Sequence, residues 1–358
     1  MKKYLIKSGI IGLIVFGIMC FNYPFACYYD TFNIFHWKNI RFTSAEPNRN
    51  FVKTKYILAN PKKFNAFIFG SSRVGYIPRT LLPREFDGTP LHWYNMTYSL
   101  GIPRENFLTL KTFLQNNVDV KLVMMCFDEV ALYISYEEHT KELLRRPYQE
   151  YEKSKISFFR PYLEASVDPS IKKELNGYKA SEHKAAAEEF YGWGGNADDF
   201  SLTENPDLTR YKASLAVSPI YTDSYKDLED MVDLCGKHGI ELILCTNPTF
   251  QTMFYEAVKW GNPFFDWLRN VAEKCEFYNF MGFNNYTTNP HYYYECSHYR
   301  PVVGLMMEQL IFGTEEEKAR IRKEAGDDLW GIKVNAGNID LVIQHLQEQL
   351  KHNMRKID

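Results

Sequence analysis

Two hydroxyl side chains, Ser71 and Ser72, follow a short apolar run that ends at Gly70. The run, residues 64–69, is rich in Phe and Ile and too short for a helix, so it predicts a buried strand. Ligands of open parallel sheets bind outside the carboxyl ends of the strands, and a serine placed there can act as a nucleophile. We therefore take Ser72 as the candidate nucleophile. The alternative is that both serines only cap the next helix.

An acid and a histidine lie three residues apart near the other end of the chain, at Glu295 and His298. They immediately precede a helix-like apolar segment, residues 302–310. On one turn both side chains can face the same edge of a sheet, where the carboxylate orients the imidazole and the imidazole takes a proton from a serine. Taken alone, this spacing is also that of a common solvated surface turn.

The elements needed to position these residues can be predicted from the pattern of the chain. Short apolar runs alternate with amphipathic segments, and this alternation predicts an α/β fold with a parallel sheet. The predicted strands are residues 64–69, 91–96, 120–127, 240–246 and 277–280, and the predicted helices include 105–117, 223–238, 264–275 and 338–352. The polar region of about 136–215 interrupts the alternation, so we expect a mainly helical insertion over the carboxyl edge, where it would shape substrate access.

The N-terminal segment predicts a membrane anchor. Residues 1–7 are basic, and residues 8–25 contain no charged side chain, which is close to the length of a membrane-spanning helix. The preceding lysines predict that the N-terminus stays in the cytoplasm and that the main domain is extracytoplasmic. A cleavable signal peptide is the alternative, although no clear small-x-small cleavage site is present. We expect a single-pass cell-membrane protein.

This interpretation divides the chain into an anchor and an exported domain. The expected parts are an anchor at 1–27, a stalk at 28–63, and an α/β domain at 64–358 with the insertion at about 136–215 and a C-terminal helical extension at about 313–358.

Composition excludes several classes of function. The net charge of -2 gives no sign of a nucleic-acid partner. Seven cysteines, an odd number without a CxxC pair, predict no disulfide framework and no structural zinc. His291 and Cys296 lie beside Glu295 and His298, but no established metal-ligand spacing is present, so we expect no metal and no cofactor. Cys296 is a weaker nucleophile candidate than Ser72, because it lies on the turn that already carries the base.

The order of these motifs resembles the SGNH/GDSL hydrolase superfamily over residues 64–312, the insertion excluded. Residues 70–72, Gly-Ser-Ser, stand where the family has its Gly-Asp-Ser block, with Ser72 at the nucleophile. Glu295 and His298 stand where the family has Asp and His. Residues 298–301, His-Tyr-Arg-Pro, are similar to a phrase found in many membrane-anchored members. The resemblance implies a three-layer, flavodoxin-like parallel sheet flanked by helices.

The resemblance also implies an oxyanion hole, which stabilises the negative oxygen formed during acyl transfer. The family takes one donor from a glycine backbone and one from an asparagine side chain; by position these correspond to Gly101 and Asp128. An ionised Asp cannot donate, so the expected donors are backbone N–H groups of Ser72 and Gly101. Asn95, Ser71 and Arg73 complete the expected oxyanion and substrate-binding set, together with Asp128.

The arrangement is nearest to exported members such as the D-alanyl-lipoteichoic acid biosynthesis protein and the alginate O-acetyltransferases. These relatives imply a serine esterase or O-acyltransferase that acts on acyl groups of cell-envelope glycans or polymers, with a multi-pass membrane acyltransferase as a partner. The alternative is a non-catalytic scaffold or glycan-binding protein of an envelope assembly. The departures from the family pattern at Asp128 and Glu295 favour that alternative.

Overall fold

The computed structural model divides the chain into two compact units: residues 1–56 with 140–188, and residues 57–139 with 189–358. It describes residues 4, 7–14, 16–17, 27–28, 30–40, 46–165, 184–196, 198–215 and 221–357. Among these residues, no helix is both long enough and apolar enough to span a bilayer. Of the predicted anchor, residues 1–27, the structure describes residues 4, 7–14, 16–17 and 27, and the other residues lie outside the described part. Every residue of the predicted site belongs to the second unit.

A six-stranded sheet forms the centre of the second unit, in the order β4-β1-β5-β6-β7-β8. Its strands are β1 (Ala66–Phe69), β4 (Trp93–Asn95), β5 (Leu122–Phe127), β6 (Glu241–Thr246), β7 (Phe277–Asn279) and β8 (Ile332–Val334). The first five in the chain pair in parallel, and β8 is antiparallel to β7. This confirms the predicted α/β class with a mostly parallel sheet. The edge strand β8 and the hairpin β2 (Glu85–Phe86) to β3 (Thr89–Pro90) were not predicted.

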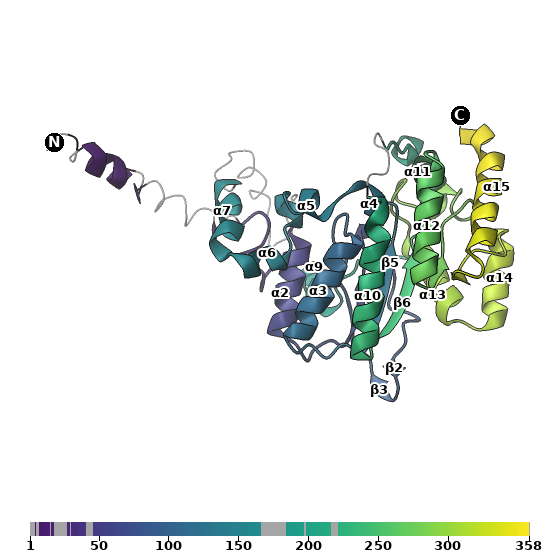
Figure 1. Ribbon diagram of the computed structural model, residues 1–358, viewed down its shortest axis with the longest axis horizontal. Coiled ribbons are helices and arrows are strands. Elements are labelled where there is room, and N and C mark those ends of the chain that lie inside the picture. The colour runs from purple at the N-terminus through teal and green to yellow at the C-terminus, as the bar shows by residue number, and fades with distance from the viewer. Residues whose placement is uncertain are drawn as a thin grey trace. The chain divides into compact units, whose positions relative to one another are not determined.

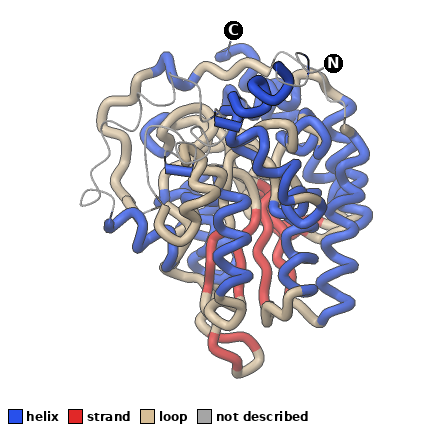
Figure 2. The backbone as a smooth tube through the Cα atoms, turned by 90° about the vertical axis from the view of Figure 1, so that its left-hand side faces the viewer, coloured by secondary structure: helices blue, strands red, loops and turns tan. Residues whose placement is uncertain are grey.

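Helices flank both faces of the sheet (Figures 1 and 2). The main ones are α3 (Pro103–Gln115), α10 (Tyr225–His238), α12 (Asn262–Lys274) and α13 (Pro301–Phe312). Successive residues of a strand point to opposite faces, so β1 contributes to both layers. Phe67 packs against Phe113 of α3, with ring centroids 5.1 Å apart. Ile68 belongs to the core that also contains Val303 and Met307 of α13. Burial on both faces explains why β1 and β5 are continuously apolar.

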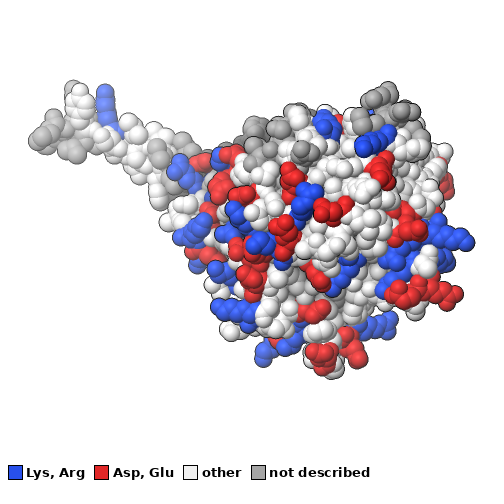
Figure 3. Space-filling model, turned by 45° about the vertical axis from the view of Figure 1, so that its right-hand side comes forward, with Lys and Arg blue, Asp and Glu red and all other residues white. Residues whose placement is uncertain are grey.

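The described residues form further α-helices. They are α2 (Arg49–Ala59), α4 (Val130–Tyr133), α5 (Tyr136–His139), α6 (Tyr148–Lys153), α7 (Lys155–Ala165), α9 (Lys184–Gly192), α11 (Gln251–Val258), α14 (Glu315–Ala325) and α15 (Ile339–Ile357). Helix α2 lies in the segment predicted as a stalk. Acidic and basic side chains alternate over the face shown in Figure 3, in keeping with the small net charge.

Candidate active site

A sharp turn leads from β1 into a short 3₁₀ helix, Ser72–Tyr76. Gly70 has φ +148°, and a Cβ at this position would lie 2.6 Å from Val74 Cγ1 and 2.7 Å from the carbonyl oxygen of Cys126. Only glycine fits there without displacing the main chain of β5. The turn therefore places Ser71 and Ser72 at the carboxyl end of the sheet.

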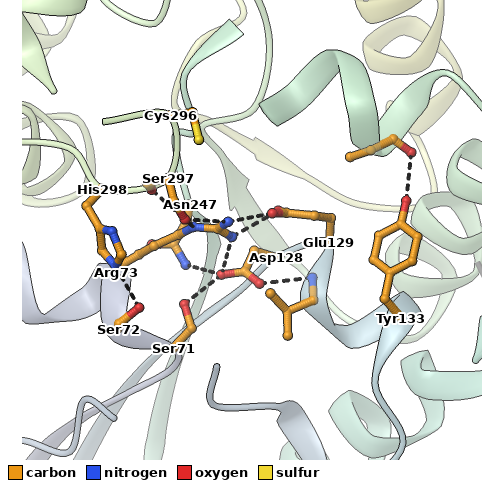
Figure 4. Close-up of polar contacts among 12 residues, drawn as sticks. Ser71, Ser72, Arg73, Asp128, Glu129, Tyr133, Asn247, Cys296, Ser297 and His298 are labelled. Atoms are coloured by element: carbon orange, nitrogen blue, oxygen red, sulfur yellow. Dashed lines mark hydrogen bonds and ion pairs between the residues drawn. The ribbon is translucent and has the colours of Figure 1, made fainter. Parts of the chain in front are cut away.

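The structure brings Ser72, His298 and Glu295 together. Ser72 Oγ lies 2.7 Å from His298 Nε2, and the two side chains face each other in Figure 4. His298 Nδ1 lies 2.5 Å from Glu295 Oε1. Glu295 also accepts the backbone N–H groups of His298, at 2.7 Å, and Ser297, at 2.9 Å. The carboxylate thus folds back on its own turn and fixes the direction of the imidazole.

The ionisation of Glu295 determines which imidazole nitrogen carries the proton. Burial opposes ionisation, but hydrogen bonds from the His298 ring and the Ser297 backbone outweigh it and lower the Glu295 pKa to about 2. An ionised carboxylate only accepts hydrogen bonds, so His298 Nδ1 must be the donor. His298 Nε2 then presents its lone pair to the Ser72 hydroxyl, as a general base requires.

Neither serine caps the following helix through its side chain, so the capping alternative is wrong. Ser71 precedes the 3₁₀ helix, yet its hydroxyl makes no capping bond. Instead, Ser71 Oγ donates to Asp128 Oδ2 at 2.8 Å. The Ser72 hydroxyl is directed to His298.

Cys296 does not have the properties of a nucleophile. Burial and the neighbouring charge of Glu295 raise the pKa of its thiol to about 12. Its Sγ donates to Glu295 Oε2 at 3.4 Å. The thiol therefore stays protonated at neutral pH, and the nucleophilic species of a cysteine is the thiolate.

Arg73 lies buried behind the two serines, although we expected it in the oxyanion and substrate-binding set. Its guanidinium contacts Glu129 twice, at 2.5 and 3.0 Å, and Asp128 Oδ2 at 2.8 Å (Figure 4). It also donates to the hydroxyl of Ser297 at 3.0 Å and to the carbonyl of Ser297 at 3.2 Å. Burial lowers the pKa of Arg73, but the two carboxylates outweigh burial and raise it. Arg73 thus links the ends of β1 and β5 to the loop that carries His298.

Asp128 and Asn95, also expected in the oxyanion set, are bonded to protein groups around the turn. Asp128 Oδ2 accepts from Asn247 Nδ2 at 3.1 Å in addition to Ser71 and Arg73, and Asp128 Oδ1 accepts the N–H of Val130 at 3.2 Å. Asn95 Nδ2 donates to the carbonyl of Val74 at 2.7 Å, within the 3₁₀ helix. Both side chains hold the turn in place.

Gly101, the predicted backbone donor, is close to the serine turn. A Cβ at Gly101 would lie 2.5 Å from the carbonyl oxygen of Gly70. The preceding residue, Leu100, has φ +53°, in the left-handed region. The main chain of Gly101, in the loop after β4, therefore lies directly against Gly70, the residue that precedes the two serines.

Four contributors to the site were not predicted from the sequence: Glu129, Ser297, Asn247 and Tyr76. Asn247 directly follows β6, and Glu129 is the second residue after β5, so a polar residue close to a strand end was the available signal. The Tyr76 ring lies 5.7 Å from the His298 ring, edge to face, and 5.0 Å from the Tyr294 ring. Aromatic rings therefore form one wall beside His298.

Among the described residues, no three or more His, Cys, Asp or Glu side chains are placed to hold a metal ion. No family model, curated protein or solved structure matches this chain. Its function is therefore inferred from the residues and their geometry.

Proposed function

We propose that this protein is a serine esterase or O-acyltransferase whose nucleophile is Ser72. The observation that carries the proposal is the continuous hydrogen-bonded chain from Ser72 Oγ through His298 to Glu295, with contacts of 2.7 and 2.5 Å. The serine and the histidine are 226 positions apart in sequence. A surface turn gives no reason for such alignment, whereas nucleophilic catalysis requires it.

The topology supports assignment to an SGNH-type, flavodoxin-like fold. Numbered along the chain, the five parallel strands lie in the order 2-1-3-4-5, which is the flavodoxin-like order. In such sheets, ligands bind where the strand order reverses, beyond the carboxyl ends of the strands. Here this position lies between β1 and β5, and Ser72 and Asp128 follow these two strands.

The proposed acylation step begins when Ser72 Oγ attacks the carbonyl carbon of an ester. His298 Nε2 takes the hydroxyl proton as the Oγ–C bond forms, and Glu295 stabilises the imidazolium. Backbone N–H groups near Ser72 and Gly101 stabilise the negative oxygen of the tetrahedral intermediate. When the intermediate collapses, His298 returns the proton to the departing alcohol, and the acyl group remains on Ser72 as an ester.

The acyl group then leaves Ser72 by the reverse chemistry. His298 removes a proton from water or from an acceptor hydroxyl, and the resulting oxygen attacks the acyl carbon. Water gives a free acid, whereas an acceptor hydroxyl gives a new ester. Both outcomes restore Ser72 and use the same three residues.

The sequence supports an extracytoplasmic place for this chemistry. The uncharged segment 8–25 after a basic start supports a single-pass anchor in the cell membrane. With the resemblance to exported acyltransferases, we propose acylated cell-envelope glycans or polymers as substrates and a multi-pass membrane acyltransferase as the partner.

Turnover of p-nitrophenyl acetate by the full-length protein tests this proposal. We expect a burst of nitrophenol release followed by slower turnover, and Ser72→Ala should reduce turnover by at least about 10³-fold. Cys296→Ala should keep turnover, because the thiol is protonated and is not the nucleophile. Absence of turnover in the wild type, or equal turnover in Ser72→Ala, would favour the scaffold alternative. Increased nitrophenol release on addition of a glycan hydroxyl acceptor, with acylated glycan as the product, would identify the transferase.

A further inference from the structure

A buried polar network lies behind the loop that carries Gly101. Tyr98 OH donates to Glu105 Oε2 at 2.6 Å, and His139 Nδ1 lies 2.6 Å from Glu105 Oε1. Tyr98 belongs to the loop after β4, Glu105 to α3 and His139 to α5. The three residues are 4%, 0% and 1% exposed. Glu105 thus joins the loop to two helices in the interior of the second unit.

The network reaches Gly101 through the Tyr98 ring. A Cβ at Gly101 would lie 2.8 Å from Tyr98 Cζ, the ring carbon that bears the hydroxyl, and 2.5 Å from the Gly70 carbonyl oxygen. The Tyr98 ring carbon and the Gly70 carbonyl therefore crowd the same side of the Gly101 main chain, so the anchored end of the ring helps to set where Gly101 lies against the serine turn. A shift of this ring would open space beside the Gly101 main chain and allow it to change position.

Stability alone is a poor explanation for this network. A buried carboxylate between a phenol and an imidazole is often no more stabilising than apolar side chains of similar volume. In addition, His139 Nε2 has no hydrogen-bond partner among the described residues, which is unfavourable for a buried group. What such a network does provide is a fixed position for the groups attached to it.

We propose that Tyr98, Glu105 and His139 are positioning residues that hold the Gly101 backbone as an oxyanion donor beside Ser72. This inference rests on the proposed serine chemistry. A displaced donor weakens binding of the transition state and leaves binding of the ester unchanged, so its loss lowers kcat with little change in KM.

The test compares Tyr98→Phe with Tyr286→Phe in the full-length protein. Tyr286 is a matched control, because it is also buried and donates to a carboxylate, Glu324, at 2.9 Å. We would measure kcat and KM for p-nitrophenyl acetate and the rate constant of labelling by a fluorophosphonate, with the folded fraction taken from thermal unfolding. We expect Tyr98→Phe to lower kcat and the labelling rate constant about tenfold at unchanged KM, part of the 10²–10³ attributed to a whole donor. Tyr286→Phe should change neither quantity.

A second pair of variants covers the case in which Tyr98→Phe fails to fold. His139→Asn keeps a donor near the position of Nδ1 and should retain most of the labelling rate, whereas His139→Leu removes the donor and should lower it. Two results would overturn this inference and leave the proposed function standing, provided that the wild type is labelled. One is an equal labelling rate constant in Tyr98→Phe and Tyr286→Phe. The other is an equal labelling rate constant in His139→Asn and His139→Leu. Wild type that is never labelled would overturn both.

Discussion

Glu295 is one methylene longer than the Asp that the proposed SGNH resemblance would place at this position, and its contacts show how a longer acid can orient a histidine. The additional methylene would push an extended side chain past the imidazole. Instead, Glu295 Oε1 accepts both the backbone N–H and the ring N–H of His298, at 2.7 and 2.5 Å. The Glu295 side chain bends back over its own turn, and this bend accommodates the additional methylene. The substitution is therefore compatible with an aligned triad.

Replacement of Glu295 by Gln tests its role in orienting the base. The amide is similar in shape, but its NH₂ group can donate to His298 Nδ1 and stabilise the wrong tautomer. We expect kcat for p-nitrophenyl acetate to fall by about 10²–10⁴. Glu324→Gln, at the carboxylate that binds Tyr286, is the control and should leave kcat unchanged. Equal kcat in wild type and Glu295→Gln would contradict the proposed triad.

The low pKa of Glu295 also predicts how stability depends on pH. Its pKa is about 2 in the folded protein against an ordinary value of 4.5, so the folded state favours the ionised form. The ionised Glu295 therefore contributes to the free energy of unfolding, and this contribution is complete above pH 4.5 and is lost as the pH falls toward 2. After allowance for partial exposure, it is on the order of 2 kcal/mol. The difference in free energy of unfolding between wild type and Glu295→Gln, measured with urea, should shrink between pH 5 and 2.5. A difference independent of pH would contradict the assigned ionisation.

At the scale of elements, the site depends on three chain segments that meet at the carboxyl edge. Local patterns predicted that polar residues follow β1 and β5 and that the turn before α13 is polar. They did not predict the Arg73 contacts, because Glu129 and Ser297 are 56 and 224 positions from Arg73 in sequence. Strand β8 was missed for a related reason. Its three residues have too little pattern, and only pairing with β7 defines it.

Arg73→Lys tests whether the link among these segments positions the triad. Lysine keeps the charge but cannot contact Glu129 twice and also reach Ser297. We expect kcat to fall about tenfold and the free energy of unfolding to fall by about 1–3 kcal/mol, the usual range for a buried group that loses its hydrogen bonds. Arg104→Lys is the control, since Arg104 is partly exposed and pairs with Asp230 at 2.9 Å. Such a pair contributes only about 0–1 kcal/mol. Equal effects of the two substitutions would contradict a positioning role for Arg73.

Gly101→Ala tests the contact between the β4–α3 loop and the serine turn. The added Cβ would lie 2.5 Å from the Gly70 carbonyl oxygen, so the loop must move. We expect kcat to fall about 10²-fold or more as an oxyanion donor is displaced, together with about 1–3 kcal/mol of stability. At Gly236, within α10, an added Cβ meets nothing within 4 Å. Gly236→Ala should raise stability by about 0.5–1 kcal/mol and leave kcat unchanged. Full activity in Gly101→Ala would exclude this contact from the mechanism.

At the scale of the whole molecule, the alternation of apolar runs was enough to predict an α/β fold with a parallel sheet. The sheet brings residues from positions 72 and 298 to one edge. Composition gave no indication of the grouping of residues 140–188 with the N-terminal segment, because that grouping depends on long-range packing. Ser72 could be proposed as the nucleophile from the sequence, whereas the contacts of Arg73 and of Tyr98 required the three-dimensional structure.

The most direct test of the central claim is to map the adduct of a fluorophosphonate on the full-length protein by mass spectrometry. The proposed site predicts a single phosphonylated residue, Ser72, in the wild type and in Cys296→Ala. It predicts no adduct in Ser72→Ala and a strongly reduced rate in His298→Ala. A wild-type protein that remains unmodified at Ser72, or equal labelling of Ser72→Ala, would contradict serine acyl chemistry at this site.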